Sequence, residues 1–164
     1  MRKETAGMTH KKLSWDEYFI QIAELVAQRT NCLSRGVGAV LVKDKMIIST
    51  GYNGTPRGVT NCDEGGCTRC TDRAKGRIKS GEKLDECFCI HAEENAILQA
   101  AYHGIATKGT TLYVTNCPCL VCARHIINAG IVKVYYNKAY AMDGLARKLL
   151  EEAGVELVEY NGGA

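Results

Sequence analysis

The sequence predicts an α/β protein, a three-layer α/β/α sandwich built on a five-stranded mixed sheet. Segments with helical periodicity alternate with short runs rich in β-branched and aromatic residues. The later strand-like segments are separated by single helices, which favours parallel neighbours with helices on both faces of the sheet. The first two strand-like segments are joined by a short turn, so this pair must be antiparallel.

The chain has 164 residues, of which 46% are hydrophobic, and this is enough for one domain with one substantial core. Residues 1–12 are mostly polar and lack apolar periodicity, which predicts a flexible tail before a single domain over residues 13–164. A net charge of +3 permits a phosphorylated ligand. It does not indicate binding along a nucleic acid, which would require a clustered basic face.

No apolar run approaches the length of a membrane helix or forms a signal-peptide core. We therefore expect no membrane association and a cytoplasmic location. Nine cysteines in such a chain favour metal binding or free thiols over disulfides, and the odd number agrees.

The first half of the domain begins with a helix over about 15–29. Ser14 and Glu17 form a capping box there, and apolar residues follow at helical spacing. Strands are then predicted over 37–42 and 46–50, with a turn at 43–45 between them.

The second half alternates helices and strands. His91 opens a helix that ends near His103, and Cys119 opens another that ends near Gly130. The remaining predicted elements are strands over 110–115, 132–136 and 155–160 and a helix over 143–153.

Two short motifs carry the chemistry of the sequence. His91-Ala92-Glu93 supplies an imidazole and a carboxylate, and Pro118-Cys119-Leu120-Val121-Cys122 supplies two thiols. A catalytic zinc needs three protein ligands and keeps its fourth position for water. Cys119 and Cys122 share one face of a helix, and Pro118 suits the first turn of that helix. If His91 stands at the start of its own helix, Glu93 lies beside the metal without being a ligand.

Together, the H-x-E and P-C-x-x-C motifs resemble those of the zinc-dependent cytidine and deoxycytidylate deaminase family. The Gly51–Arg57 segment G-Y-N-G-T-P-R, the cysteine-rich loop and the continuation after His91 look like deoxycytidylate deaminases over residues 14–160. The resemblance implies zinc on His91, Cys119 and Cys122, and Glu93 as the proton carrier. It also implies that dCMP is hydrolysed to dUMP and ammonia.

Substrate contacts are less specific in the sequence. From the residues alone, G-Y-N-G is an ordinary turn, but the resemblance implies that Asn53 meets the deoxyribose hydroxyl. Tyr136 and Tyr140 are candidates for the base or phosphate pocket, although Tyr136 fits a core position equally well. The candidates for a phosphate partner, which the sequence does not rank, are Arg35, Arg57 and Lys138.

A cysteine-rich loop covers about 55–90 and has no convincing periodicity. A loop of this length needs something to hold it, and a thiolate metal site would do so. The resemblance to phage and competence-operon deoxycytidylate deaminases implies a structural zinc on Cys32, Cys62, Cys67 and Cys87. Cys70 is the main competitor, and Cys89 could pack against the sheet. Six thiols exceed the needs of one zinc, so two are spare or a second loop metal exists.

The resemblance also implies quaternary structure and regulation. Members of the family are commonly hexamers controlled by dCTP and dTTP, with G-Y-N-G near the effector site, so a homo-oligomer is expected. Two other functions remain open. An adenosine deaminase acting on tRNA would need a more basic surface, and a non-enzymatic zinc-binding interaction module would need closed metal sites and a dispensable Glu93.

Overall fold

The computed structural model describes residues 12–137 and 144–162. All of the predicted N-terminal tail except Lys12 lies outside the described residues, as do Lys138 and Tyr140. Among the described helices, none has the length and apolar character required to cross a membrane.

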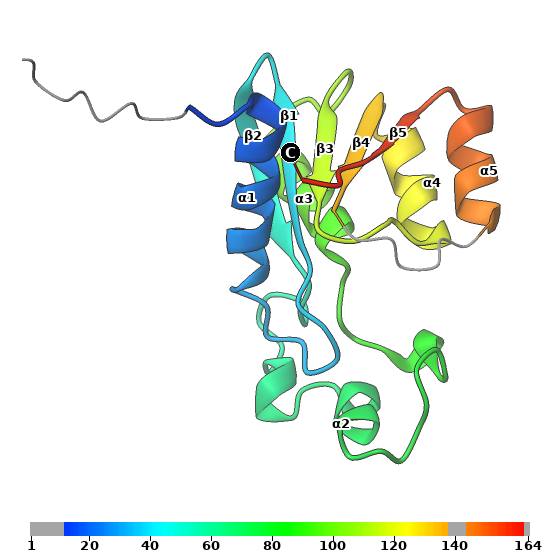
Figure 1. The fold of residues 1–164 in the computed structure, drawn as a ribbon. Helices are drawn as coiled ribbons and strands as arrows, with labels where there is room; N and C mark the ends of the chain where they lie inside the picture. The colour runs from blue at the N-terminus through cyan, green and yellow to red at the C-terminus, as the bar shows by residue number, and fades with distance from the viewer. Residues whose placement is uncertain (1–11, 138–143, 163–164) are drawn as a thin grey trace, which may run out of the picture.

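A five-stranded mixed sheet forms the middle layer (Figure 1). The spatial order is β2-β1-β3-β4-β5, with β1 antiparallel to both β2 and β3, and with β3, β4 and β5 mutually parallel. This confirms the predicted mixed sheet. The strands are β1 (Gly38–Lys43), β2 (Met46–Tyr52), β3 (Thr111–Val114), β4 (Lys133–Tyr136) and β5 (Glu156–Glu159).

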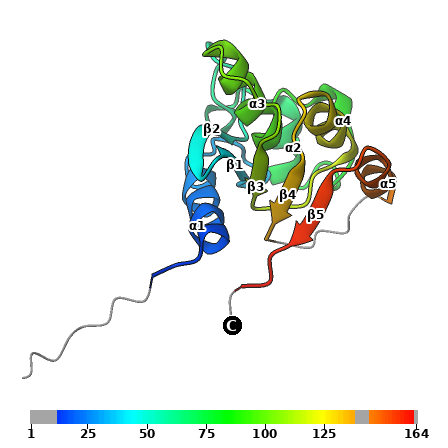
Figure 2. The same ribbon diagram turned by 90° about the horizontal axis from the view of Figure 1, so that it is seen from above.

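Helices cover both faces of the sheet, which confirms the three layers. Figure 2 shows α1 (Trp15–Ala27) on one side of the sheet. The Ser14 side chain accepts the Glu17 N–H at the start of this helix. The capping box therefore predicted this helix correctly, and the helix ends two residues before the expected Arg29. The opposite side carries α3 (Ala92–Tyr102), α4 (Leu120–Asn128) and α5 (Gly144–Glu152).

Strand β1 shows why two faces are buried. Val40 and Val42 point toward α1 and pack with Phe19, whereas Leu41 points the other way and packs with Ala96 of α3. Successive side chains of a strand point to opposite faces, so a nearly continuous apolar strand requires cover on both sides. Each fully buried Leu, Val or Phe contributes roughly 2 kcal/mol through removal of apolar surface from water.

The β1–β2 hairpin turns at Asp44 and Lys45, both with positive φ (50° and 61°). Left-handed backbone at both central residues defines the two-residue turn whose twist matches the strands. Lys43, expected in the turn, is the last residue of β1.

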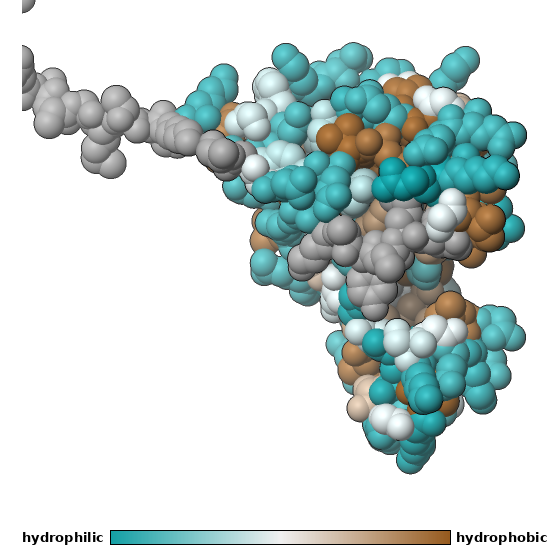
Figure 3. Space-filling model, turned by 45° about the vertical axis from the view of Figure 1, so that its right-hand side comes forward, coloured by the Kyte–Doolittle hydropathy of each residue, from teal (hydrophilic) through white to brown (hydrophobic). Residues whose placement is uncertain are grey.

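The cysteine-rich loop forms a lobe below the sheet, over residues 55–90 (Figure 1). In the space-filling view it is a protrusion with hydrophilic residues over most of its outer surface (Figure 3). The lobe contains 3₁₀ turns at Cys62–Glu64 and Leu84–Glu86 and a helix, α2 (Thr68–Ala74), which the sequence analysis missed. A helix of seven residues is too short to display an apolar period.

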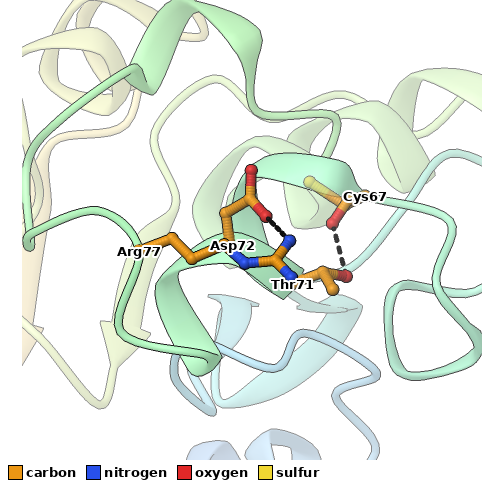
Figure 4. A network of polar contacts seen from close by, with 4 residues as sticks. All are labelled: Cys67, Thr71, Asp72 and Arg77. Carbon is orange, nitrogen blue, oxygen red and sulfur yellow. Dashed lines mark hydrogen bonds and ion pairs between the residues drawn. The ribbon is translucent and has the colours of Figure 1, made fainter.

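Local polar contacts hold α2 in place. The Thr71 hydroxyl donates to the Cys67 carbonyl at 3.1 Å, and Arg77 pairs with Asp72 at 3.0 Å (Figure 4). The ion pair is largely exposed and contributes little to stability by itself. The lobe must therefore be held mainly by something other than its surface contacts.

Candidate active site

His91 is the N-cap residue of α3, with extended backbone (φ −73°, ψ 155°). The imidazole therefore precedes the helix, and Glu93 falls in the first turn. This is the arrangement that lets two residues so close in sequence reach one site, as the sequence analysis required.

The two thiols stand at the start of α4. Cys119 is its N-cap and Cys122 lies in its first turn, so both sulfurs face the start of α3. Pro118 lies before the helix instead of in its first turn, where the sequence analysis placed it. An extended residue must cap the helix, and Cys119 takes that position.

The three donor atoms converge. His91 Nδ1 lies 3.3 Å from Cys122 Sγ and 3.4 Å from Cys119 Sγ, and the three atoms lie within 4.8 Å of one another. Tetrahedral zinc, with Zn–N of about 2.0 Å and Zn–S of about 2.3 Å, places nitrogen and sulfur roughly 3.5 Å apart. No fourth His, Cys, Asp or Glu in the described chain joins this group. The residues therefore fit a zinc ion that keeps one position open.

The electrostatics of the thiols favour a metal ligand. Hydrogen bonds from the Cys122 thiol and from His91 lower the pKa of Cys119 to about 3. Two helix N-termini, which carry partial positive charge, also meet here. Cys119 is therefore a thiolate at neutral pH, which is the form that binds zinc.

Glu93 is buried, with 4% of its surface exposed. Burial raises the pKa of its carboxyl to about 7, while the nearby His91 acts in the opposite direction, and the Cys122 thiol lies within hydrogen-bond reach. A carboxyl group with a pKa near neutrality can both accept and release a proton at physiological pH.

Strand β2 fixes the position of α3. A Cβ atom on Gly51 would lie 2.2 Å from the Ala92 carbonyl oxygen and 2.3 Å from the Ala96 nitrogen. Only glycine permits this approach of the strand to the first turns of the helix. Ile90, two residues before α3, pairs with Gly54 in an isolated antiparallel bridge. The G-Y-N-G segment thus holds the start of α3 against the sheet.

Asn53 is buried in this segment and engaged with the backbone. Its Oδ1 accepts the Val37 N–H at 2.8 Å and lies 2.9 Å from the Thr30 hydroxyl, and its Nδ2 donates to the Arg35 carbonyl at 2.6 Å. The amide therefore joins β2 to the loop after α1. A contact with the sugar would use the second Nδ2 hydrogen, and this role stays a prediction.

The other substrate candidates lie apart from one another. Tyr136, 4% exposed, belongs to the main core at the end of β4, and a role in the substrate pocket stays a prediction. Arg57 stacks over the Tyr102 ring at 5.1 Å and lines a cavity of about 770 Å³ beside α3. Gly51, Tyr52 and Gly54 of the G-Y-N-G segment line the same cavity. The segment therefore marked this cavity in the sequence, but only the family resemblance connected it with a nucleotide.

The loop cysteines form two groups of four sulfurs, each within 4.8 Å. One group contains Cys32 and Cys62, the other contains Cys67 and Cys87, and Cys70 and Cys89 belong to both. The predicted set of Cys32, Cys62, Cys67 and Cys87 takes one pair from each group, and neither group contains all four, so this ligand set stays a prediction. Cys70, which the sequence analysis named as the main competitor, and Cys89 lie in both groups.

Two thiols of this group, Cys32 and Cys87, form thiolates readily, whereas burial raises the pKa of Cys62 and Cys70. Hydrogen bonding with the Cys89 thiol lowers the pKa of both Cys32 and Cys87 to about 5, although burial acts in the opposite direction. All nine cysteines of the chain are free thiols in the structure. Cys32 and Cys87 are therefore thiolates at neutral pH, and metal binding by the other lobe thiols must release their protons.

The chain is similar in sequence to known proteins. Residues 13–138 match the family model of the cytidine and deoxycytidylate deaminase zinc-binding region. Deoxycytidylate deaminases of Schizosaccharomyces pombe and Saccharomyces cerevisiae are 48% and 44% identical to this chain over 90% of its length. The chain spans 44% and 45% of the length of these two curated relatives.

The fold has counterparts among solved structures. The dCMP deaminase of cyanophage S-TIM5, solved in complex with dCMP and dUMP, is similar with a TM-score of 0.71 and 33% identity. The match covers 92% of this chain and 100% of the cyanophage chain. The similarity therefore extends over both the sheet and the cysteine-rich lobe.

Proposed function

The chain belongs to the cytidine and deoxycytidylate deaminase family, and we propose that it catalyses the hydrolysis of dCMP to dUMP and ammonia. The observation that carries this proposal is the convergence of His91, Cys119 and Cys122 beside a buried Glu93. Three metal donors with a neighbouring carboxyl group are what hydrolytic removal of an amino group from a base requires.

In this proposal His91, Cys119 and Cys122 hold the zinc ion of the family. A zinc ion bound with one open position lowers the pKa of a coordinated water toward neutrality. The protein orients its donors through the N-termini of α3 and α4, and Cys119 is a thiolate at neutral pH before any metal binds.

Glu93 moves the protons. Its carboxylate accepts a proton from the attacking water and delivers it to N3 of the cytosine ring, which makes C4 electrophilic. Oxygen then bonds to C4. A second proton transfer through Glu93 goes to the amino group, and the C4–N bond breaks to release ammonia and leave uracil. The raised pKa of Glu93 suits both directions of transfer.

The choice of dCMP rests on the relatives. The two yeast relatives are named deoxycytidylate deaminases, and the cyanophage relative was solved with dCMP and dUMP. We propose that Asn53 contacts the deoxyribose and that Tyr136 contributes to the pocket wall. Arg35 is a further candidate partner for the phosphate.

A substrate panel tests the function. Purified protein is incubated with dCMP, cytidine, dCTP and an adenosine-containing tRNA stem-loop, and the release of ammonia is measured. Fast release from dCMP alone is the expected result. Release from the stem-loop alone would indicate a tRNA adenosine deaminase. Bound zinc without release from any substrate would indicate an interaction module.

Regulation and assembly form the second part of the proposal. The 770 Å³ cavity, lined by G-Y-N-G residues with Arg57 and Tyr102, offers a cation and an aromatic face to a nucleotide such as dCTP or dTTP. We propose that these nucleotides regulate a homohexamer through this cavity. Nine free thiols suit the reducing cytoplasm as its location.

A further inference from the structure

The six cysteines of the lobe come from four separate parts of the chain. Cys32 follows α1, Cys62 begins a 3₁₀ turn, Cys67 and Cys70 are at the start of α2, and the other two precede α3. Their two groups of four sulfurs share Cys70 and Cys89.

The distances between sulfurs match tetrahedral metal coordination. Cys70 Sγ lies 3.8 Å from Cys32 Sγ, 3.7 Å from Cys87 Sγ and 4.0 Å from Cys89 Sγ, and Cys67 Sγ lies 4.0 Å from Cys87 Sγ. Four thiolates around zinc at about 2.3 Å lie roughly 3.8 Å apart. A disulfide would bring two sulfurs to about 2.05 Å. The spacing therefore fits metal coordination and excludes a covalent bond.

The number of thiolates limits how two ions could be bound. Two separate tetrahedral ions need eight thiolates, and six thiolates provide eight bonds only when two of them bind both ions. We propose that the lobe holds a binuclear zinc cluster in which the thiolates of Cys70 and Cys89 bridge the two ions. Cys32 and Cys62 complete one ion, and Cys67 and Cys87 complete the other.

The lobe has no other core. Its buried hydrophobic cluster consists of Cys62, Cys67 and Cys70, with the other three cysteines packed around them and no aliphatic or aromatic member among the described residues. A segment of this size without an apolar core needs metal or covalent links to stay folded. A cluster of two ions supplies that link at the place where four segments meet.

The surroundings support charged sulfurs. The Leu33 N–H donates to Cys62 Sγ at 3.4 Å, and the backbone N–H groups of Ser34 and Arg35 donate to Cys32. Arg73 donates to the Ser34 carbonyl at 3.1 Å, so α2 is tied to the loop that carries Cys32. These N–H groups offset part of the negative charge that six thiolates retain after binding two Zn²⁺ ions.

Metal counting by native mass spectrometry of the full chain tests the proposal. We expect three zinc ions per chain, one at the catalytic site and two in the lobe. The double variant Cys119→Ser/Cys122→Ser should keep two, and Cys117→Ser, a thiol outside both groups, should keep all three. Wild-type protein that saturates at two ions or one would overturn the binuclear cluster.

Paired variants test the bridge. Cys70 and Cys62 are both fully buried, but only Cys70 belongs to both groups. Cys62→Ser removes a ligand from one ion and should release one zinc, whereas Cys70→Ser should release two. Equal zinc loss from the two variants would contradict bridging.

Cadmium-113 NMR of the wild-type protein keeps the test independent of how the variants fold. Shared thiolates predict two lobe resonances split by scalar coupling to each other. Two uncoupled resonances, or a single one, would overturn the proposal. These experiments measure the metal count and the coupling between ions, whereas the deaminase assay depends on the catalytic site. A negative result for the binuclear cluster is therefore distinguishable from a negative result for the proposed function.

Discussion

Two groups of metal-binding residues lie two residues apart in this chain, one including His91 and the other including Cys89. They differ in the number and type of their donor atoms and in whether a carboxyl group lies beside them. The first has three donors from two helix starts, an exposed His91 and a buried carboxyl group beside it. The second has six thiols, three of them fully buried, and no imidazole or carboxylate among its members. An incomplete donor set next to a proton carrier suits chemistry, and a saturated set suits structure.

The supports of the two sites also differ. Around the catalytic site, the residues of α3 that face the sheet, Ala92 and Ala96, are fully buried, so apolar packing holds the helix without metal. The buried hydrophobic residues of the lobe, which the structure describes throughout residues 55–90, are all cysteines. We therefore expect metal at the first site to be needed for activity and metal at the second site to be needed for folding.

Stepwise chelation gives the largest expected effect. A chelator attacks an ion through an open coordination position, so the zinc at His91 should leave first, with activity lost in proportion and the fold kept. Removal of the lobe zinc should then unfold residues 55–90, because structural zinc contributes on the order of 10 kcal/mol to folding. Zinc release, ammonia production and amide hydrogen exchange of the lobe are measured together.

Readdition of zinc after the first stage should restore activity, which is the control for irreversible damage. Loss of hydrogen-exchange protection in the lobe before any loss of activity would reverse the assignment of the two sites.

Glu93→Gln separates proton transfer from metal binding. The amide has nearly the same shape as the carboxyl group but cannot accept and release a proton near neutral pH. The value of kcat should therefore fall about 10³-fold, which corresponds to roughly 4 kcal/mol. The zinc count should not change, because Glu93 is not a member of the donor group. Glu94→Gln, one residue along the same helix, is the matched control and should keep nearly full activity. A Glu93→Gln enzyme with normal turnover would remove Glu93 from the mechanism.

Gly51→Ala tests whether the sheet positions the catalytic site. The new methyl group would overlap backbone atoms of Ala92 and Ala96, which cannot move independently of the helix. We expect a loss of about 3 kcal/mol in unfolding free energy and a lower kcat, with the lobe zinc retained. Gly144→Ala is the control, since no atom lies within 4 Å of its added Cβ and its φ is ordinary. Thermal unfolding should show little change in the control, and equal effects of the two substitutions would refute the argument.

Part of the catalytic half of the comparison could be predicted from sequence because it is local. Residues three apart share a helix face, which pairs Cys119 with Cys122, and a residue at the N-cap lies ahead of the first turn, which separates the roles of His91 and Glu93. That the two motifs form one site was implied by the family resemblance, since 28 positions separate His91 from Cys119. The strands and α1 were also predicted from local signals, namely runs of β-branched and aromatic residues and the Ser14 cap.

The lobe could not be predicted in this way. Its sulfurs join Cys32 to Cys89 across 57 positions, through a segment whose only helix has seven residues. Apolar periodicity in the sequence cannot predict which thiols lie close together in a segment where metal ligands replace an apolar core. The number of cysteines was informative, whereas their grouping needed the fold.

Tyr113→Phe should have the smallest effect and sets the reference for the others. The Tyr113 hydroxyl donates to Asp16 Oδ1 at 2.7 Å on the α1 side of the sheet, on the face opposite α3 and α4. Loss of one such hydrogen bond costs about 1 kcal/mol in unfolding free energy, measured by urea denaturation. Burial raises the pKa of Tyr113, so the donor is present throughout the range below the unfolded value of about 10, and the loss should not vary with pH from 7 to 9. The kcat and the zinc count should equal those of the wild type, since a change in either would mean that the α1 face is coupled to the metal sites.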